Sequence, residues 1–139
     1  MSRTLEVTLH NRLSELERVG EVVESFGETH RLPPKVVHAV TLCVDEVVTN
    51  IIGYAYADQA DHRITLRLSL QADELAAEVE DDGKPFNPLD APEPDLSLPL
   101  EERPIGGLGV HFVRKLMDGV EYRREQGKNL LVMKKHVSA

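Results

Sequence analysis

The sequence has 139 residues, 41% of them hydrophobic, and 24 acidic against 16 basic side chains give a formal net charge of −8. A chain of this length buries enough apolar surface for one core, so we predict a single domain over residues 1–139. The negative charge disfavours a nucleic-acid partner, because binding to a phosphate backbone depends on clustered Lys and Arg.

Targeting signals are lacking in the sequence. No uninterrupted apolar run approaches the roughly 20 residues that cross a bilayer, and MSRTLEVTLH has neither the charged nor the apolar region of a signal peptide. We therefore expect no membrane span and a cytoplasmic location. The single cysteine, Cys43, cannot form an internal disulfide, and its apolar neighbours predict a buried small side chain.

Hydrophobic periodicity predicts one strand and two helices in the first part of the chain. Residues 4–10 alternate between polar and apolar, which indicates a half-buried strand. Asn11 is placed to cap a helix over 13–27, where apolar residues recur every three or four positions. A second, central helix starts at Pro33–Pro34 and carries a broad apolar stripe to Ile51.

A hairpin and a long loop follow the central helix. Residues 63–71 and 75–80 alternate cleanly and predict two strands joined by a turn. Periodicity then vanishes between 81 and 104, a stretch with six of the eight prolines. Because loops of this length inside compact domains are more often functional than accidental, we predict a lid at about 84–105.

The last part of the chain completes the predicted fold. A third helix begins after Gly107, and strands follow near 120–125 and 129–135. This order of elements predicts an α/β two-layer sandwich, with helices on one face of a mixed, largely antiparallel sheet.

Glu46 and Asn50 form the first candidate site. They are four residues apart in the second helix, so their side chains share one face about 6 Å apart. An amide oxygen is a hard ligand for Mg²⁺, and a carboxylate can accept a proton from an attacking hydroxyl. The spacing selects Glu46 over its neighbour Asp45. A solvated polar face is the alternative explanation for this pair.

Two further motifs carry candidate ligand contacts. In VEDDGKPFNP, Asp81 at a strand end can accept a hydrogen bond from an adenine amino group, and Gly83 lets backbone pass close to a planar base. A plain turn is the alternative there. In RPIGGLGVHFVRKLMDG, the glycines before a helix can direct N–H groups at phosphate, or form a flexible hinge. These glycines are Gly106, Gly107 and Gly109.

In their order along the chain, these motifs resemble the Bergerat ATP-binding fold of the GHKL superfamily. DGKPFNP, GGLGVHFVRKLMD and VEYRREQGKNLLVMKK are similar to the bacterial anti-sigma-factor serine kinases, and the likeness covers nearly the whole chain. The resemblance implies ATP and Mg²⁺ as cofactors, Glu46 as general base and Asn50 as the Mg²⁺ ligand. It also implies that Asp81 contacts adenine and that Gly83 shapes the adenine pocket.

The same resemblance implies that Gly106, Gly107 and Gly109 lie beside the phosphates. Its implied partners are a STAS-type anti-sigma-factor antagonist and a sigma factor. A homodimer is possible, and the sequence leaves the oligomeric state open. Two residues depart from the family pattern: Tyr54 replaces a frequent histidine, and Pro85 replaces the second glycine of DxGxG.

The leading hypothesis is phosphoryl transfer from ATP to a serine of the antagonist, with sigma-factor sequestration as the linked output. The alternative is a non-catalytic ATP-binding module that switches partners, and fold alone does not separate the two. A histidine-kinase catalytic domain would need a helical segment with a phosphoacceptor histidine, and we see none before residue 13. ATP hydrolysis by water with the same Glu46 is chemically open.

Overall fold

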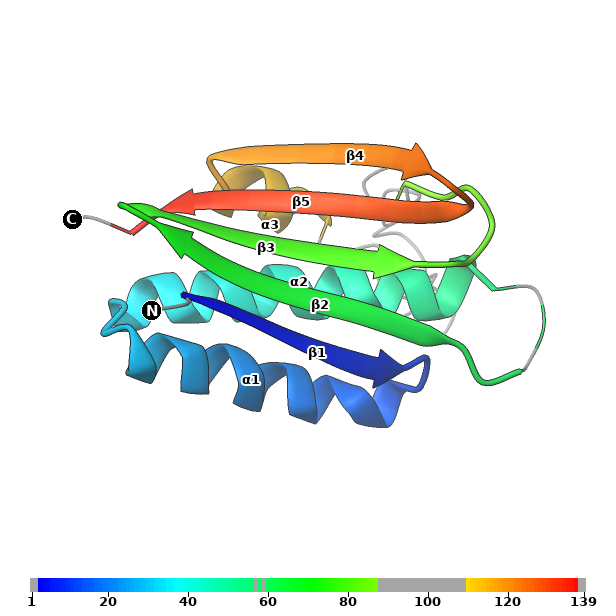
Figure 1. Ribbon diagram of the computed structural model, residues 1–139, viewed down its shortest axis with the longest axis horizontal. Coiled ribbons are helices and arrows are strands. Elements are labelled where there is room, and N and C mark those ends of the chain that lie inside the picture. The colour runs from blue at the N-terminus through cyan, green and yellow to red at the C-terminus, as the bar shows by residue number, and fades with distance from the viewer. Residues whose placement is uncertain (1–2, 57, 59, 88–109, 138–139) are drawn as a thin grey trace, which may run out of the picture.

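The computed structural model of the protein describes residues 3–56, 58, 60–87 and 110–137, with side chains from residue 113 onward in the last range. Its five strands form one sheet in the order β1-β2-β3-β5-β4, and every pairing of these strands is antiparallel (Figure 1). The strands are β1 Thr4–His10, β2 Arg63–Gln71, β3 Glu74–Asp81, β4 Gly119–Glu125 and β5 Lys128–His136. The expected α/β two-layer sandwich is confirmed, and no parallel pair occurs among the described strands.

The helices lie together on one face of this sheet (Figure 1). A short 3-10 helix precedes the α-helices, and the described set is 3-10 helix Leu13–Glu15, α1 Leu16–Thr29, α2 Pro34–Tyr54 and α3 Val110–Leu116. Proline fits the start of α2, because the first N–H groups of a helix have no intrahelical acceptor. As expected, α2 is the central helix, packed between α1 and α3.

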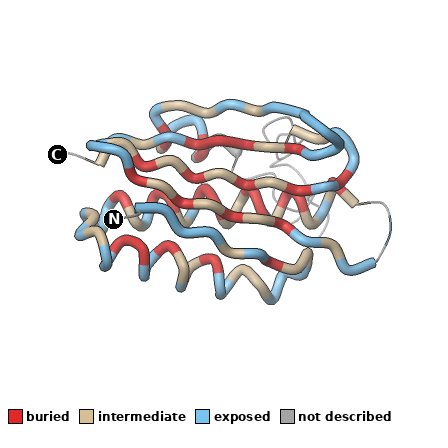
Figure 2. The backbone as a smooth tube through the Cα atoms, in the orientation of Figure 1, coloured by how far each residue is buried: buried red, intermediate tan, exposed pale blue. Residues whose placement is uncertain are grey.

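By length and composition alone, α2 could cross a membrane. No such helix was expected from the sequence, because Asp45 and Glu46 interrupt its apolar run. The apolar residues of α2 instead belong to the hydrophobic core, together with residues of the sheet and α1. Figure 2 shows buried positions recurring along this helix. The buried cysteine prediction is confirmed here: Cys43 is 1% exposed, and burial raises the pKa of its thiol to about 11.

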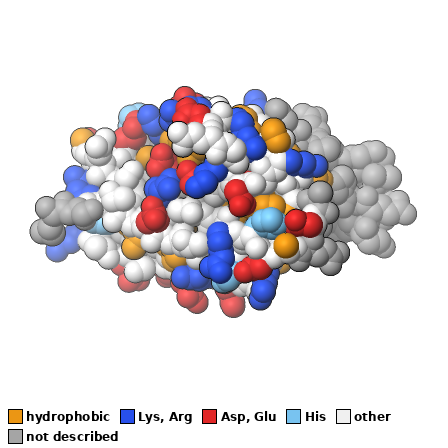
Figure 3. Space-filling view, turned by 45° about the vertical axis from the view of Figure 1, so that its right-hand side comes forward, with side chains coloured by type: hydrophobic (Ala, Val, Ile, Leu, Met, Phe, Trp, Pro, Cys, Tyr) orange, Lys and Arg blue, Asp and Glu red, His pale blue; other side chains and the backbone are white. Residues whose placement is uncertain are grey.

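The strands alternate between this core and the open face of the sheet. In β2, Ile64, Leu66 and Leu68 are fully buried, while the residues between them face outward. On the open face, Arg67 Nε donates to Glu6 Oε2 at 2.7 Å and its guanidinium lies 3.5 Å from Glu80. Acidic and basic side chains are interspersed on this side of the molecule (Figure 3).

One local prediction about the start of α1 needs correction. Asn11 does not cap the helix: its Nδ2 donates to Ala60 O at 3.2 Å and its Oδ1 accepts from His62 N at 2.9 Å. The helix ends at Thr29, two residues after Gly27 and so near its predicted end. A Cβ at Gly27 would lie 2.4 Å from Val37 Cγ2, so this glycine allows α1 to approach α2 closely.

Candidate functional site

The candidate site begins where β3 ends. Register places Asp81 opposite Asn129 of β5, and Asn129 in turn opposite Arg124 of β4. Asp81 and Asn129 belong to the buried, helix-facing rows of their strands and are 2% exposed. Two segments distant in sequence, the end of β3 and the β4–β5 hairpin, therefore place polar side chains at one end of the sheet.

Asp81 has two carboxylate oxygens in different environments. Oδ1 accepts hydrogen bonds from Gly83 N at 2.9 Å and Asn129 Nδ2 at 3.0 Å. Oδ2 is buried and has no hydrogen-bond partner among the described residues. Burial raises the pKa of Asp81, and the two hydrogen bonds oppose this rise. One oxygen is thus held by the protein while the other is available to a ligand donor.

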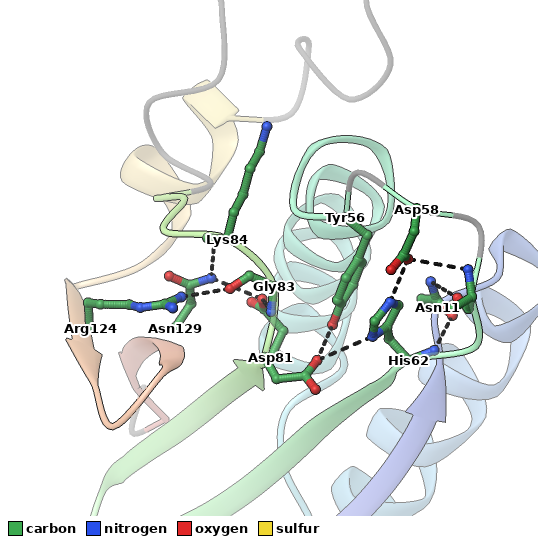
Figure 4. Close-up of polar contacts among 11 residues, drawn as sticks. Asn11, Tyr56, Asp58, His62, Asp81, Gly83, Lys84, Arg124 and Asn129 are labelled. Carbon is green, nitrogen blue, oxygen red and sulfur yellow. Dashed lines mark hydrogen bonds and ion pairs between the residues drawn. The ribbon is translucent and has the colours of Figure 1, made fainter.

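Asn129, to which the sequence analysis assigned no role, is the centre of this cluster (Figure 4). Besides Asp81, its Nδ2 donates to Lys84 O at 2.8 Å. Its Oδ1 accepts from Phe86 N at 3.2 Å and from the Tyr122 hydroxyl. Both donors and both acceptor positions of the amide are therefore used. The one sequence signal at this position is a polar residue at the start of the apolar run NLLVM, and that signal alone assigns no role.

Gly83 connects the turn to the C-terminal end of α2. A Cβ at Gly83 would lie 2.5 Å from Ala55 O, and the neighbouring Lys84 N donates to that same oxygen at 2.9 Å. Arg124 also donates to Gly83 O at 2.7 Å (Figure 4). The structure thus explains the glycine by close backbone packing, and its role in shaping a base pocket stays a prediction.

The polar pair of α2 lies towards the same end of that helix. Asn50 is 1% exposed, and neither its Oδ1 nor its Nδ2 has a hydrogen-bond partner among the described residues. Glu46, one turn earlier, is half-buried. Ala55 is five residues after Asn50, a rise of about 7.5 Å along the helix. Along the helix axis, this separation is shorter than a nucleotide.

Contacts at the last turn of α2 support this arrangement. The rings of Tyr54 and Phe86 lie 5.7 Å apart, which places the segment after the strand-end turn beside the helix.

Asp45, the carboxylate next to Glu46, is half-buried, and its Oδ1 has no partner within the described part of the chain. Burial raises the pKa of Asp45.

A second polar network, also missed from sequence, lies on the outer side of the turn. The Tyr56 hydroxyl donates to Asp82 Oδ1 at 3.2 Å, and the Tyr56 ring stacks on His62 at 4.1 Å. His62 Nε2 lies 2.7 Å from Asp58 Oδ1 (Figure 4). Burial and the charges of Asp81 and Asp82 raise the pKa of Tyr56. This network fastens the connection from α2 to β2 against the turn.

Several predicted site residues lie outside the described residues. They are Gly106, Gly107 and Gly109, together with most of the expected lid at 84–105. The third helix does begin close to its predicted position, since α3 starts at Val110. Among the described residues, no group of three His, Cys, Asp or Glu side chains could hold a metal ion.

Comparison with known proteins agrees with this geometry. The model of the histidine kinase-like ATPase domain matches residues 9–135, which is most of the chain. The protein therefore belongs to the histidine kinase-like ATPase family, as the resemblance in the sequence implied.

Within this family, the chain is similar to serine kinases. It is 31% identical over 97 residues to the serine/threonine-protein kinase BtrW of Bordetella bronchiseptica, covering 70% of this chain and 68% of BtrW. It is 30% identical over 97 residues to the serine-protein kinase RsbW of Bacillus mycoides, covering 67% of this chain and 60% of that protein.

A solved structure supports the fold independently of sequence. The crystal structure of the RsbU and RsbW domains of a Mycobacterium tuberculosis protein matches with a TM-score of 0.71 at 15% identity. The match covers 98% of this chain and 33% of that protein's chain. At this identity the likeness concerns the fold alone, and it extends over almost all of the present chain.

Proposed function

We propose that this protein is an ATP-dependent serine kinase that phosphorylates a small STAS-type anti-sigma-factor antagonist in the cytoplasm and sequesters a sigma factor. The observation that carries the proposal is the buried Asp81 Oδ2, unpartnered within the described part of the chain. The turn that follows Asp81 contacts Ala55 at the end of α2, the helix that carries Glu46 and Asn50. Kinase activity in BtrW and RsbW, stated in their names, supports the choice of reaction.

The adenine end of the proposed site rests on Asp81. An ionised carboxylate only accepts hydrogen bonds, and Oδ2 has no protein donor among the described residues. The exocyclic amino group of adenine supplies such a donor. A buried polar atom that gains its hydrogen bond only with ligand bound favours that ligand over analogues without the donor.

The phosphate end of the proposed site rests on α2. Asn50 offers a buried amide oxygen, a hard donor of the kind that suits Mg²⁺. Proteins commonly hold Mg²⁺ through few side chains and the substrate phosphates, so the lack of a three-residue cluster in the described ranges fits this ion. When bound, Mg²⁺ would neutralise charge on the phosphates. Gly106, Gly107 and Gly109 remain the predicted phosphate-side glycines.

Glu46 is the proposed general base. It would accept the proton of the partner's serine hydroxyl while the serine oxygen bonds to the γ-phosphorus of ATP. The bond from that phosphorus to the bridging oxygen breaks, and the products are phosphoserine and ADP. Most of the rate in such reactions comes from positioning and charge stabilisation, so Asp81 and Asn50 contribute by holding ATP in place.

A phosphoryl-transfer assay tests the proposal. The protein is incubated with Mg-ATP and purified candidate antagonists, and phosphoserine is measured by mass spectrometry; nucleotide binding is measured by calorimetry. We expect Glu46→Gln to bind Mg-ATP like the wild type but to lose transfer by about 100-fold or more, the usual range for a general base.

Asp45→Asn is the matched comparison, since it changes the adjacent carboxylate of the same helix. Loss of transfer in Asp45→Asn together with normal transfer in Glu46→Gln would show that the base is wrongly assigned. Partner binding that depends on ATP, with no phosphoserine formed by any antagonist, would instead favour the non-catalytic switching module.

A further inference from the structure

We propose that Asn129 determines base selectivity: it fixes the Asp81 carboxylate so that only Oδ2 faces the ligand, and it links base recognition to the position of residues 84–86. This inference rests on the proposed nucleotide site. Asn129 is a positioning residue, because it acts on the base through Asp81 and contacts no reacting atom in the proposed reaction.

The geometry of the amide supports the first part of the proposal. A carboxylate at a strand end can rotate and exchange its two oxygens unless one of them is held. Asn129 Nδ2 and Gly83 N both donate to Oδ1, at 3.0 and 2.9 Å, so the protein satisfies one oxygen and leaves the other. The Tyr122 hydroxyl and Phe86 N donate to Asn129 Oδ1, and these bonds fix which way the amide is turned.

The chemistry of the bases supports selectivity for adenine. An oriented, ionised Oδ2 accepts from the amino group of adenine, whereas guanine presents a carbonyl oxygen at the same position. Two acceptors facing each other in a buried site leave both unsatisfied, and this disfavours guanine. A protonated carboxyl group that is free to turn can also present its O–H donor to the guanine carbonyl, so it discriminates less between the bases.

The second part of the proposal follows from the remaining bonds of Asn129. Its Nδ2 donates to Lys84 O at 2.8 Å, and its Oδ1 accepts from Phe86 N at 3.2 Å. Phe86 also contacts Tyr54 at the end of α2. The amide that orients Asp81 therefore also holds the backbone that leads away from the turn.

Charge supports the same role for Asn129. Burial raises the pKa of Asp81, and the charge of Asp82 adds to this rise. The hydrogen bond from Asn129 and the charge of Arg124 both lower the pKa of Asp81. Tyr56 donates its hydroxyl to Asp82, and burial together with the charges of Asp81 and Asp82 raises its pKa, so its phenol stays protonated. Without Asn129, the acid limit of adenine-nucleotide binding is expected to move to higher pH.

The test compares wild type and Asn129→Leu by calorimetry with Mg-ATP and Mg-GTP, over a series of pH values. We expect the ratio of ATP to GTP affinity to fall by about tenfold or more in the variant, the usual effect of one hydrogen bond to a charged group. We also expect faster hydrogen exchange of the Phe86 amide, which loses its acceptor.

Asn11→Leu is the matched control, because it removes the side-chain hydrogen bonds of a different asparagine, to Ala60 O and from His62 N. This variant should leave the ratio of ATP to GTP affinity unchanged. Asn129→Ala replaces Asn129→Leu if circular dichroism shows that the leucine variant is unfolded. A folded Asn129 variant with the wild-type affinity ratio and wild-type Phe86 exchange would overturn the inference. Wild type that binds no adenine nucleotide would instead overturn the proposed function.

Discussion

The two polar regions of the site differ in how the protein satisfies them. In the strand-end turn, Asn129 uses its full hydrogen-bonding capacity within the protein. In α2, Asn50 is just as deeply buried, yet neither amide atom has a partner among the described residues. Burial of an unbonded amide costs free energy, whereas the amide in the turn is fully bonded within the protein. This contrast is what the proposed roles require: Asn129 as a support and Asn50 as a group that meets the ligand.

Replacing each of the two asparagines by leucine tests this contrast most directly. Asn129→Leu leaves several buried groups without their hydrogen-bond partner, so we expect the free energy of unfolding to fall by about 3 kcal/mol. Asn50→Leu removes a buried amide that has no bond within the described part of the protein, so we expect a rise of about 1 kcal/mol. Urea denaturation of the two variants measures both values.

Calorimetry with Mg-ATP supplies the second half of this comparison. Asn50→Leu should lose nucleotide affinity even though the protein becomes more stable, a pattern expected of a residue kept for function. If Asn50→Leu proves as destabilising as Asn129→Leu, the Asn50 amide has a structural partner and the contrast between the two regions is wrong.

Asp81→Asn tests the carboxylate that the turn supports. The amide can keep Oδ1 towards Gly83 N and Asn129, but it replaces the acceptor Oδ2 by a donor that faces the adenine amino group. We expect Mg-ATP affinity to fall by about 100-fold, or 2.7 kcal/mol, with little loss of stability. Asp82→Asn, in the exposed neighbouring carboxylate, should bind normally; equal losses in both variants would argue against a specific contact.

The sequence predicted the fold well because its signals are local. Alternation in β2 and β3 and the proline-led start of α2 each depend on neighbouring residues, and the described elements agree with them. Asp81 stood out for a similar reason, because DDG after an alternating strand is visible within a few residues. The helical spacing of Glu46 and Asn50 likewise required only the period of α2.

Asn129 could not be assigned from the sequence because its role depends on register between distant strands. Asp81 and Asn129 are opposite each other across β3 and β5, and a shift of one residue would turn Asn129 to the open face. The Asn11 prediction failed for a related reason: its local pattern fits a helix cap, but its Oδ1 accepts instead from His62 N, 51 residues away in the sequence.

Gly83→Ala tests how firmly the turn is attached to α2. The new Cβ would meet Ala55 O at 2.5 Å, a backbone atom that cannot move aside without shifting the end of the helix. We expect the free energy of unfolding to fall by about 2 kcal/mol, with weaker Mg-ATP binding. Gly20→Ala is the control in α1, since nothing lies within 4 Å of its Cβ, and it should stabilise the protein by about 0.5–1 kcal/mol.

The pH dependence of stability gives the smallest expected effect and probes Asp81 in the absence of ligand. Burial raises the pKa of Asp81 in the folded protein above its ordinary value of 3.8. A raised folded-state pKa contributes stability that is complete below the unfolded-state pKa and is lost as pH rises through the folded-state pKa. The free energy of unfolding of wild type, measured relative to Asp81→Asn by urea denaturation, should therefore decrease as pH rises from 3.8. A difference that stays constant or increases over this range would show that the hydrogen bonds from Asn129 and Gly83 outweigh burial, and that the turn stabilises the ionised carboxylate even before a base is bound.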